Sequence, residues 1–253
     1  IFSDVGVLLR KFLESGGIGS NYIGNLWIRE HGGHSYRRSP TAPLIENLDE
    51  LPLIDRQIWD KWISAPENYP SLLLGRGCPF KCTYCANHAM ARLSEGKYVR
   101  FRSPENIVSE IKRLREDYPN IRRIYLEVET FGANRKASFA IFDALAELNS
   151  TLETKIRFGI NLALTSNLMQ NTTRIQETLR KASAANIRSI NIGLESGSER
   201  MRKEVLIRPG YRNDELVEFC RAAKEWEIDI IFFVLMGLPG ETVEDYKETI
   251  KTA

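Results

Sequence analysis

The sequence lacks three features that would place it in large classes of protein. The longest apolar run near its end, residues 230–237, is far too short to span a bilayer, and the first residues do not form a cleavable signal. Its 35 Lys and Arg residues nearly balance its 33 Asp and Glu residues, so no basic field favours nucleic acid. We therefore predict a cytoplasmic globular protein with no membrane span and no nucleic-acid partner.

Cysteine is also scarce, and its distribution is informative. Of four cysteines, Cys78, Cys82 and Cys85 lie within eight positions. In a reducing compartment such a cluster indicates metal or redox chemistry rather than a disulfide framework. Cys220 lies in a predicted helix beside apolar residues, and we interpret it as a buried structural thiol.

The cysteine loop offers fewer ligands than an iron–sulfur cluster takes. A 4Fe-4S cluster binds four thiolates, so three on one loop leave one iron open to an outside ligand. Methionine can bind that iron through its amine and carboxylate, which places a sulfonium beside an electron donor, and one electron then gives a 5′-deoxyadenosyl radical. Gly75 and Gly77 allow a close backbone approach, and Tyr84 can cover the cluster.

A zinc site is the alternative interpretation of the same loop. His88 follows the third cysteine by three residues, so the four side chains could form a closed Cys3His shell. Zinc modules prefer paired short knuckles to a single loop after a buried strand, which favours the cluster.

From Ser71 onward, apolar strand patterns alternate with helical patterns. The expected strands cover residues 72–74, 121–128, 156–160, 189–194 and 229–235, and the expected helices start at Ser103-Pro104 or cover about residues 137–148, 173–184 and 214–226. This order predicts the α/β class, with a parallel sheet that closes partly or fully into a TIM-type barrel. Functional residues should gather at the carboxyl ends of its strands.

Both ends of the chain interrupt an expected helix. The first helical pattern stops at Gly16-Gly17, and the last helix opens with a capping box of Thr242 and Asp245. An irregular segment with several prolines continues to Tyr69, where we place a boundary. We expect a fragment of a longer protein that lacks the last barrel strand.

Three motifs together resemble one family. The segment Cys78-Pro-Phe-Lys-Cys82-Thr-Tyr-Cys85 resembles the signature of the radical S-adenosylmethionine (radical SAM) superfamily. Residues 191–199 and 233–242 resemble two further segments of that family, in the right order and on the expected strands. The resemblance covers about residues 71–253 and implies a 4Fe-4S cluster and S-adenosylmethionine as cofactors.

The N-terminal third suggests a branch of this superfamily. Residues 25–33 and 42–52 resemble the tail of a cobalamin-binding domain and its linker in the cobalamin-associated branch. This implies a domain remnant at 1–40, a linker at 41–69 and a radical SAM core at 70–253. We expect His31 and His34 to be exposed loop residues rather than cobalt ligands.

The resemblance also implies roles for individual side chains around the cofactor. Glu129 would accept the methionine ammonium, with Glu127 as a competitor for that role, and Glu195 would bind the ribose hydroxyls with Ser196 beside it. Arg208 would pair with the methionine carboxylate or steady Glu195. The remaining S-adenosylmethionine-binding candidates are Tyr84, Asn161, Leu235 and Gly237, the last two beside the adenine.

The implied activity is reductive cleavage of S-adenosylmethionine to start radical chemistry on a small-molecule substrate. In the cobalamin-associated branch this is often methyl transfer relayed by cobalt, or a related C–C, C–P or ring-forming reaction. A flavodoxin or ferredoxin would donate the electron. Two alternatives stay open: a methylthiotransferase-like enzyme without cobalamin, and a non-catalytic iron–sulfur or zinc module, for which a ribose site would have no use.

Overall fold

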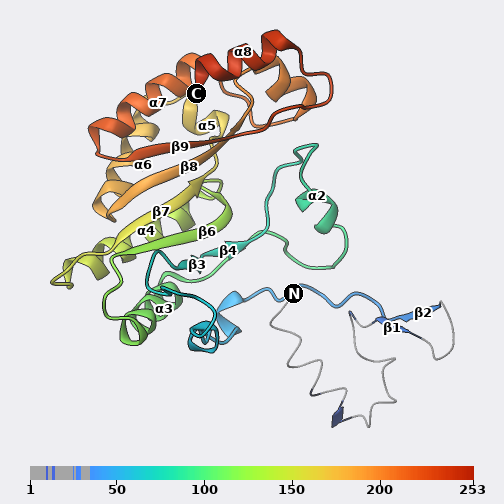
Figure 1. The fold of residues 1–253 in the computed structure, drawn as a ribbon, viewed down its shortest axis with the longest axis vertical. Coiled ribbons are helices and arrows are strands. Elements are labelled where there is room, and N and C mark those ends of the chain that lie inside the picture. The colour runs from blue at the N-terminus through green and yellow to red at the C-terminus, as the bar shows by residue number, and fades with distance from the viewer. Residues whose placement is uncertain (1–9, 11–12, 15–24, 26, 30–34) are drawn as a thin grey trace.

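The computed structural model describes residues 10, 13–14, 25, 27–29 and 35–253. Its body is a parallel sheet in the order β3-β6-β7-β8-β9 (Figure 1). The strands are β3 (Ser71–Leu73), β6 (Arg123–Phe131), β7 (Arg157–Leu162), β8 (Ile187–Glu195) and β9 (Asp229–Val234). Within the described chain β3 and β9 form open edges, so the predicted α/β class and partial barrel are confirmed.

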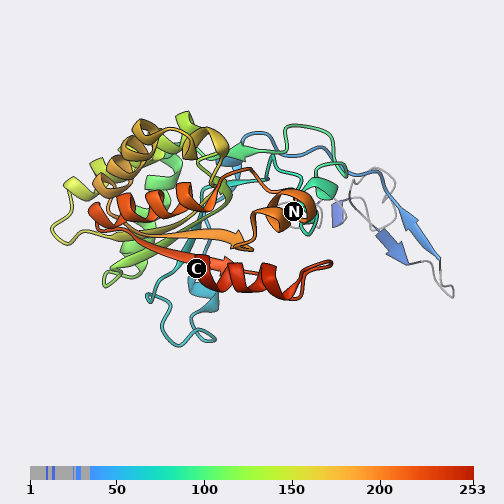
Figure 2. The same ribbon diagram turned by 90° about the horizontal axis from the view of Figure 1, so that it is seen from above.

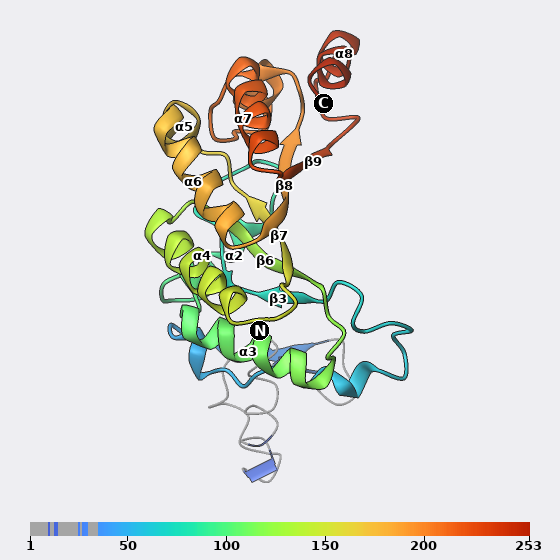
Figure 3. The same cartoon turned by 90° about the vertical axis from the view of Figure 1, so that its left-hand side faces the viewer.

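The long helices lie in a column along one side of the sheet (Figure 3). They are α3 (Pro104–Asp117), α4 (Arg135–Ser150), α6 (Thr172–Ala184) and α7 (Asn213–Glu225). The last helix, α8 (Val243–Thr252), lies apart from α4 and α6, next to the chain that follows β8 (Figure 2). The predicted helix starts are confirmed, because Ser103 caps α3 and Thr242 and Asp245 form the capping box of α8.

Alternating residues give each strand two unlike faces. The outer face packs against the helices through aliphatic and aromatic side chains that are at most 1% exposed: Ile124, Leu126, Phe158, Ile160, Ile190 and Ile192. The residues between them point to the inner face and include polar ones on β6, β7 and β8. Because strand side chains alternate, one sheet supplies both a core and a polar surface.

A short antiparallel ribbon interrupts the regular alternation and was not predicted. β4 (Gly75–Arg76) pairs with β5 (Arg100–Phe101), and between them lies α2 (Asn87–Met90). A Cβ on Gly75 would lie 2.5 Å from the Arg100 carbonyl oxygen, so the pairing requires glycine. The ribbon closes the base of the long loop that carries the cysteines.

The remaining elements are short. They are the hairpin of β1 (Trp27–Arg29) and β2 (Tyr36–Arg38), the 3-10 turns η2 (Leu48–Glu50) and η3 (Gln57–Trp59), α5 (Ser166–Met169) and the π-helical turn η4 (Met201–Val205). The segment before β3 is held to the core by Arg56, which pairs with buried Glu110 at 3.0 Å. Its division from an N-terminal domain at residue 40 stays a prediction.

Two predictions on the N-terminal part fall outside the described residues. These are the first helix, which was expected to end at Gly16-Gly17, and the positions of His31 and His34. In the described part of the chain, no helix has both the length and the apolar character that a membrane span needs.

Candidate functional site

The cysteine loop leaves the ribbon at the carboxyl end of the first strand. Cys82 is buried, Cys78 and Cys85 are half-buried, and all three are free thiols. The loop is tied to the turn after β8, because Thr83 donates from its amide to the Leu206 carbonyl (3.1 Å) and from its hydroxyl to the carbonyl of Val205 (2.6 Å). Segments 122 residues apart thus form one side of the site.

Two side chains orient the third cysteine. Asn87 donates to the Cys85 sulfur from its backbone amide (3.5 Å) and from its side-chain amide (3.7 Å). The Tyr98 hydroxyl donates to the side-chain oxygen Oδ1 of Asn87 at 2.6 Å, which fixes the orientation of the side-chain amide. Gly77, at φ 87°, lies so close that a Cβ would approach the Tyr98 carbonyl oxygen to 2.3 Å. The loop therefore packs on Tyr98.

The ends of β8 and of the cysteine loop meet in a three-residue cluster. The Tyr84 hydroxyl donates to a Glu195 carboxylate oxygen at 2.9 Å, and Arg208 donates to that hydroxyl at 2.7 Å. Arg208 also lies 3.4 Å from the Glu195 carboxylate and donates to the Gly193 carbonyl at 2.6 Å. Of the two partners expected for Arg208, the structure contains Glu195.

A shift in strand register and a glycine make room for this cluster. The β8–β9 pairing shifts between Gly193 and Glu195, and Glu195 takes a left-handed conformation with φ 63°. A Cβ on Gly193 would lie 2.3 Å from a Glu195 carboxylate oxygen. Non-glycine residues adopt such a φ at a cost that is common in functional sites. Glycine at 193 is therefore required for the position of Glu195.

Charge couples the cluster to the thiols. Burial opposes the charge on Arg208, yet Tyr84 and Glu195 outweigh it and raise the pKa of the guanidinium. Burial raises the pKa of Cys82, and Arg208 works in the opposite direction. Burial also raises the pKa of Cys78, reinforced by its neighbours Cys82 and Cys85. The three thiols are therefore close enough to repel one another when ionised, and Arg208 is the cation that favours ionisation of Cys82.

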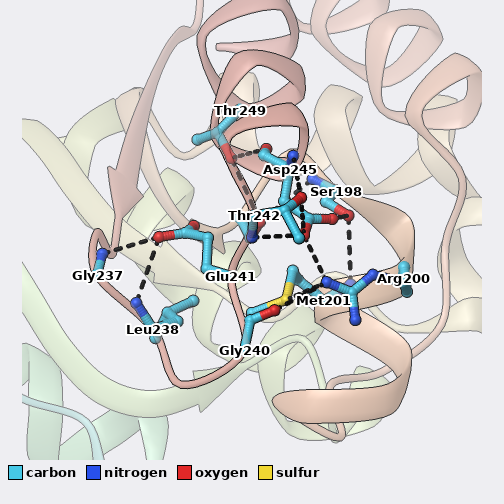
Figure 4. Close-up of polar contacts among 11 residues, drawn as sticks. Ser198, Arg200, Met201, Gly237, Leu238, Gly240, Glu241, Thr242, Asp245 and Thr249 are labelled. Carbon is cyan, nitrogen blue, oxygen red and sulfur yellow. Dashed lines mark hydrogen bonds and ion pairs between the residues drawn. The ribbon is translucent and has the colours of Figure 1, made fainter.

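The turn after β9 is held by a carboxylate at its own end. Glu241 accepts from the backbone amides of Gly237 (2.8 Å) and Leu238 (3.3 Å), as Figure 4 shows. Gly237 and Gly240 have φ of 73° and 74°, which suit glycine. Leu235 begins the segment and donates to the Glu195 carbonyl at 2.8 Å, so the turn starts beside Glu195.

A second hydrogen-bond network joins this turn to α8 and to the segment after β8 (Figure 4). Asp245, from the first turn of α8, accepts from Arg200 and, at 2.6 Å, from the Ser198 hydroxyl. Arg200 also donates to the Gly240 carbonyl at 3.1 Å. The hydrogen bond from Arg200 is the main reason that the pKa of Asp245 lies well below its usual range. One ion pair thus joins the segment after β8 to the end of the turn.

Ser196 belongs to this supporting network rather than to the cluster of Tyr84, Glu195 and Arg208. Its side chain is fully buried, its hydroxyl lies 3.3 Å from that of Thr249, and it accepts from the Ser198 amide at 3.2 Å. The structure therefore does not bring Ser196 beside the Glu195 carboxylate, although the two are adjacent in sequence.

The other two predicted residues lie on the inner face of the sheet. Glu129, on β6, is exposed and close enough to raise the pKa of Cys78 and of Tyr98. Asn161, at the end of β7, accepts from the Tyr125 hydroxyl and donates to Glu127 at 3.3 Å. Glu129 thus lies beside the cysteine loop, whereas Asn161 contacts side chains of the neighbouring strand β6.

Comparison with known protein families decides the class. The family model of the radical SAM superfamily matches residues 72–253. This chain belongs to the radical SAM superfamily. The predicted recognition is thereby confirmed, and the loop and the strand ends described above all fall within the matched range.

Relatives of the radical SAM chain include several enzyme types. An uncharacterised methyltransferase of Pyrococcus horikoshii is 28% identical over 220 residues, which cover 86% of this chain and 44% of that protein. A tRNA-2-methylthio-N6-dimethylallyladenosine synthase of Desulforamulus reducens is 30% identical over 178 residues, covering 69% and 36%. The chain therefore spans less than half of these curated relatives.

Solved structures show the same fold at low identity. The radical SAM methyltransferase TsrM of Kitasatospora setae has a TM-score of 0.71 at 15% identity and covers 96% of this chain and 46% of its own. The cobalamin-dependent radical enzyme OxsB has a TM-score of 0.72 at 19% identity and covers 97% and 34%. Both matches extend beyond residues 72–253 into the N-terminal segment.

The residues present fit the 4Fe-4S cluster of the superfamily. Three free cysteines share one loop, and ionising them close together is costly unless iron neutralises the charge. Among the described residues no three His, Cys, Asp or Glu side chains are grouped to hold a single ion, and this applies to the three cysteines as much as to the Cys3His set of the alternative interpretation. His88 Nδ1 is buried without a hydrogen-bond partner.

Sequence reasoning missed several residues that build this site. They are Asn87, Tyr98, Ser198 and Arg200. The signal for Asn87 was available, since an asparagine two residues after a cysteine can donate locally to the sulfur. Tyr98, Ser198 and Arg200 act through contacts between segments that are distant in sequence, and no local sequence pattern predicts such contacts.

Proposed function

We propose that this chain is the core of a cobalamin-dependent radical SAM enzyme that transfers a methyl group or forms a related C–C, C–P or ring bond. The observation that carries this is the meeting of the three-cysteine loop with Tyr84, Glu195 and Arg208 at the strand ends. The cobalamin part is supported by the two cobalamin-type neighbours, whose likeness extends through residues before 72.

In this proposal each side chain has a defined task. Cys78, Cys82 and Cys85 hold the cluster, which when bound supplies the electron that cleaves S-adenosylmethionine. Glu195 accepts hydrogen bonds from the ribose hydroxyls, and Arg208 keeps it ionised and oriented. Glu129, beside the cysteine loop, accepts a hydrogen bond from the ammonium of the methionine moiety.

The backbone after β9 has the remaining task. The segment from Leu235 to Gly237 lies beside Glu195 and offers main-chain groups to the adenine, while Glu241 keeps the turn in shape. A one-electron donor such as a flavodoxin or ferredoxin, and a small-molecule substrate, complete the reaction.

The test is anaerobic reconstitution of the full-length protein with iron and sulfide, then dithionite and S-adenosylmethionine. We expect 5′-deoxyadenosine by chromatography, lost together with iron and brown colour in Cys82→Ala. Cys220→Ala, on the outer helix α7, is the matched control and should keep both. Activity retained by Cys82→Ala, or stoichiometric zinc in place of iron, would remove the cluster from the mechanism.

A second candidate, a methylthiotransferase without cobalamin, is favoured by the 30% identity to the tRNA-modifying synthase. Titration with hydroxocobalamin separates the two, because the proposed enzyme should bind it stoichiometrically with a change in visible absorption. Both candidates take a methyl group from S-adenosylmethionine and release S-adenosylhomocysteine, so that product does not separate them. Absence of hydroxocobalamin binding, with methylthiolation of bulk tRNA, would favour the second candidate.

A further inference from the structure

The inner face of the sheet carries a row of polar side chains below the cofactor residues. Strand register aligns Asn161 with Asn191 and Asn191 with Ile231, while Leu126 pairs with Ile160 and so places Glu127 beside Asn161. At about 3.3 Å per residue, this row lies roughly 13 Å along β8 from Glu195.

Hydrogen bonds in this row run in one direction. The Asn191 amide donates to the Tyr125 hydroxyl at 2.5 Å, and that hydroxyl donates to the Asn161 carbonyl oxygen. The Asn161 amide then donates to the Glu127 carboxylate at 3.3 Å. At the other end, Asn191 Oδ1 is buried and has no partner. The row therefore ends in an acceptor on both sides.

The ionised carboxylate fixes that direction. If both amides were flipped, the Asn161 carbonyl oxygen would face Glu127, and two acceptors would oppose each other. With Glu127 ionised, the chain of donors can only run toward it. Glu127, which is half-buried, is the end of the row that a donor from solvent can reach, whereas Asn191 Oδ1 is buried.

No cation of the described chain compensates Glu127. The titratable groups beside it are Glu129 and Tyr125 on its own strand, and Tyr69 packs against Tyr125 from the segment before β3. Tyr69 also closes the amino end of the inner face, where its hydroxyl lies 3.5 Å from that of Ser189. Burial first, and then Glu129, raise the pKa of Glu127, and no cation is among the groups that offset them.

The neighbouring strand gives the same face an apolar side. Ile231 and Phe233 of β9 share the inner face with Asn191 and Gly193 by register, and they are 45% and 53% exposed. Their neighbours Ile230 and Phe232 pack against the core instead. The inner face thus offers acceptors on β6–β8 beside an apolar surface on β9.

We propose that Glu127 recognises the substrate, which carries a protonated amine held against the carboxylate and an apolar portion placed on Ile231 and Phe233. The inference rests on the proposed function, since it assigns the substrate class of that same site. It gives Glu127 a role distinct from that of Glu129: the first binds the substrate amine, and the second binds the cofactor ammonium.

The test is equilibrium dialysis of simple probes against reconstituted full-length protein saturated with S-adenosylmethionine. The probes are phenethylamine, 2-phenylethanol and 3-phenylpropionate, which share a ring and differ in the polar end. We expect phenethylamine to bind about tenfold more tightly than the alcohol, the factor of one charge-assisted hydrogen bond. 3-Phenylpropionate should bind most weakly, because it brings a second negative charge.

Variants assign the preference to Glu127. Glu127→Gln should bind amine and alcohol equally, and Glu147→Gln, exposed on α4, should keep the preference. Amine binding should also weaken as acid protonates Glu127. Equal binding of all probes by the wild type, or an amine preference that survives in Glu127→Gln, would overturn the inference.

Deoxyadenosine formation by the wild type separates this inference from the proposed function. An amine preference without deoxyadenosine would leave the recognition row standing and remove the radical activity. Deoxyadenosine without an amine preference would do the reverse.

Discussion

The two faces of the sheet are built from the same strands, but the outer face packs against helices and the inner face carries polar groups. On the outer face, Ile160 and Ile192 are at most 1% exposed and pack against helices, which is the arrangement that stabilises an α/β domain. On the inner face, one residue further along each strand, Asn161 and Gly193 serve a hydrogen-bonded row and the Glu195 cluster. Stability and chemistry are therefore separated by a single residue step.

The inner face keeps polar groups that a stable core would not keep. Asn191 Oδ1 and Arg208 Nε are buried without partners, and Glu195 has a left-handed backbone. Each feature costs stability, and such costs persist where function needs them. Substitutions at neighbouring positions on the two faces test whether the outer face supplies the stability and the inner face the binding.

The largest effect on stability should come from the outer face. Ile160→Ala leaves a cavity in the core and should lower the free energy of unfolding by about 2–5 kcal/mol. Asn161→Ala, the adjacent residue on the inner face, should lower it by about 1 kcal/mol through lost hydrogen bonds. Urea unfolding followed by circular dichroism measures both. Equal losses would mean that the inner face also stabilises the fold.

A smaller effect, on binding alone, should come from Arg208→Lys. Lysine keeps the charge but cannot contact Tyr84, Glu195 and Gly193 at once, as the guanidinium does. We expect the Kd for S-adenosylmethionine to rise about tenfold, with the iron content unchanged. Arg113→Lys, in an exposed pair on α3, is the control and should bind normally. Loss of iron in Arg208→Lys would instead make the arginine a support of the cysteine loop.

The outer face and the cysteine loop were predictable, because their signals are local. Apolar alternation gave the five strands, and the spacing of Cys78, Cys82 and Cys85 gave the cluster loop. The motif ending β8 placed Glu195 at a strand end, where the structure has it.

The supporting contacts were not predictable, for a physical reason. The β4–β5 ribbon has two residues per strand, too few to show a period. Arg200 and Asp245 are 45 positions apart and meet only after the sheet has formed. Ser196 looked like a neighbour of Glu195 in sequence, but the register shift after Gly193 turns the two side chains into different surroundings.

A third effect should appear behind the turn after β9, where Asp245 has a depressed pKa. Such a carboxylate stabilises the fold above its ordinary pKa of 3.8, and this contribution is lost as pH falls through the lower folded value. Asp245→Asn should therefore lower the Tm by about 2–4 °C at pH 7. The difference should shrink below about pH 4, as calorimetry of cluster-free protein can test. A difference that does not vary with pH would assign the loss to packing.

The smallest effect, of opposite sign, should come from Glu127→Gln on the inner face. Because burial raises the pKa of Glu127, the fold favours its protonated form: that contribution is full at acid pH and is lost as pH rises through the folded pKa. At pH 7 the carboxylate is thus a cost, and glutamine should raise the Tm by about 1–2 °C. The gain should vanish near pH 4, where the wild type is itself protonated. Glu147→Gln should show no gain at either pH, whereas a loss in Glu127→Gln at pH 7 would mean that a cation already pairs with Glu127 and that the inner face is not waiting for one.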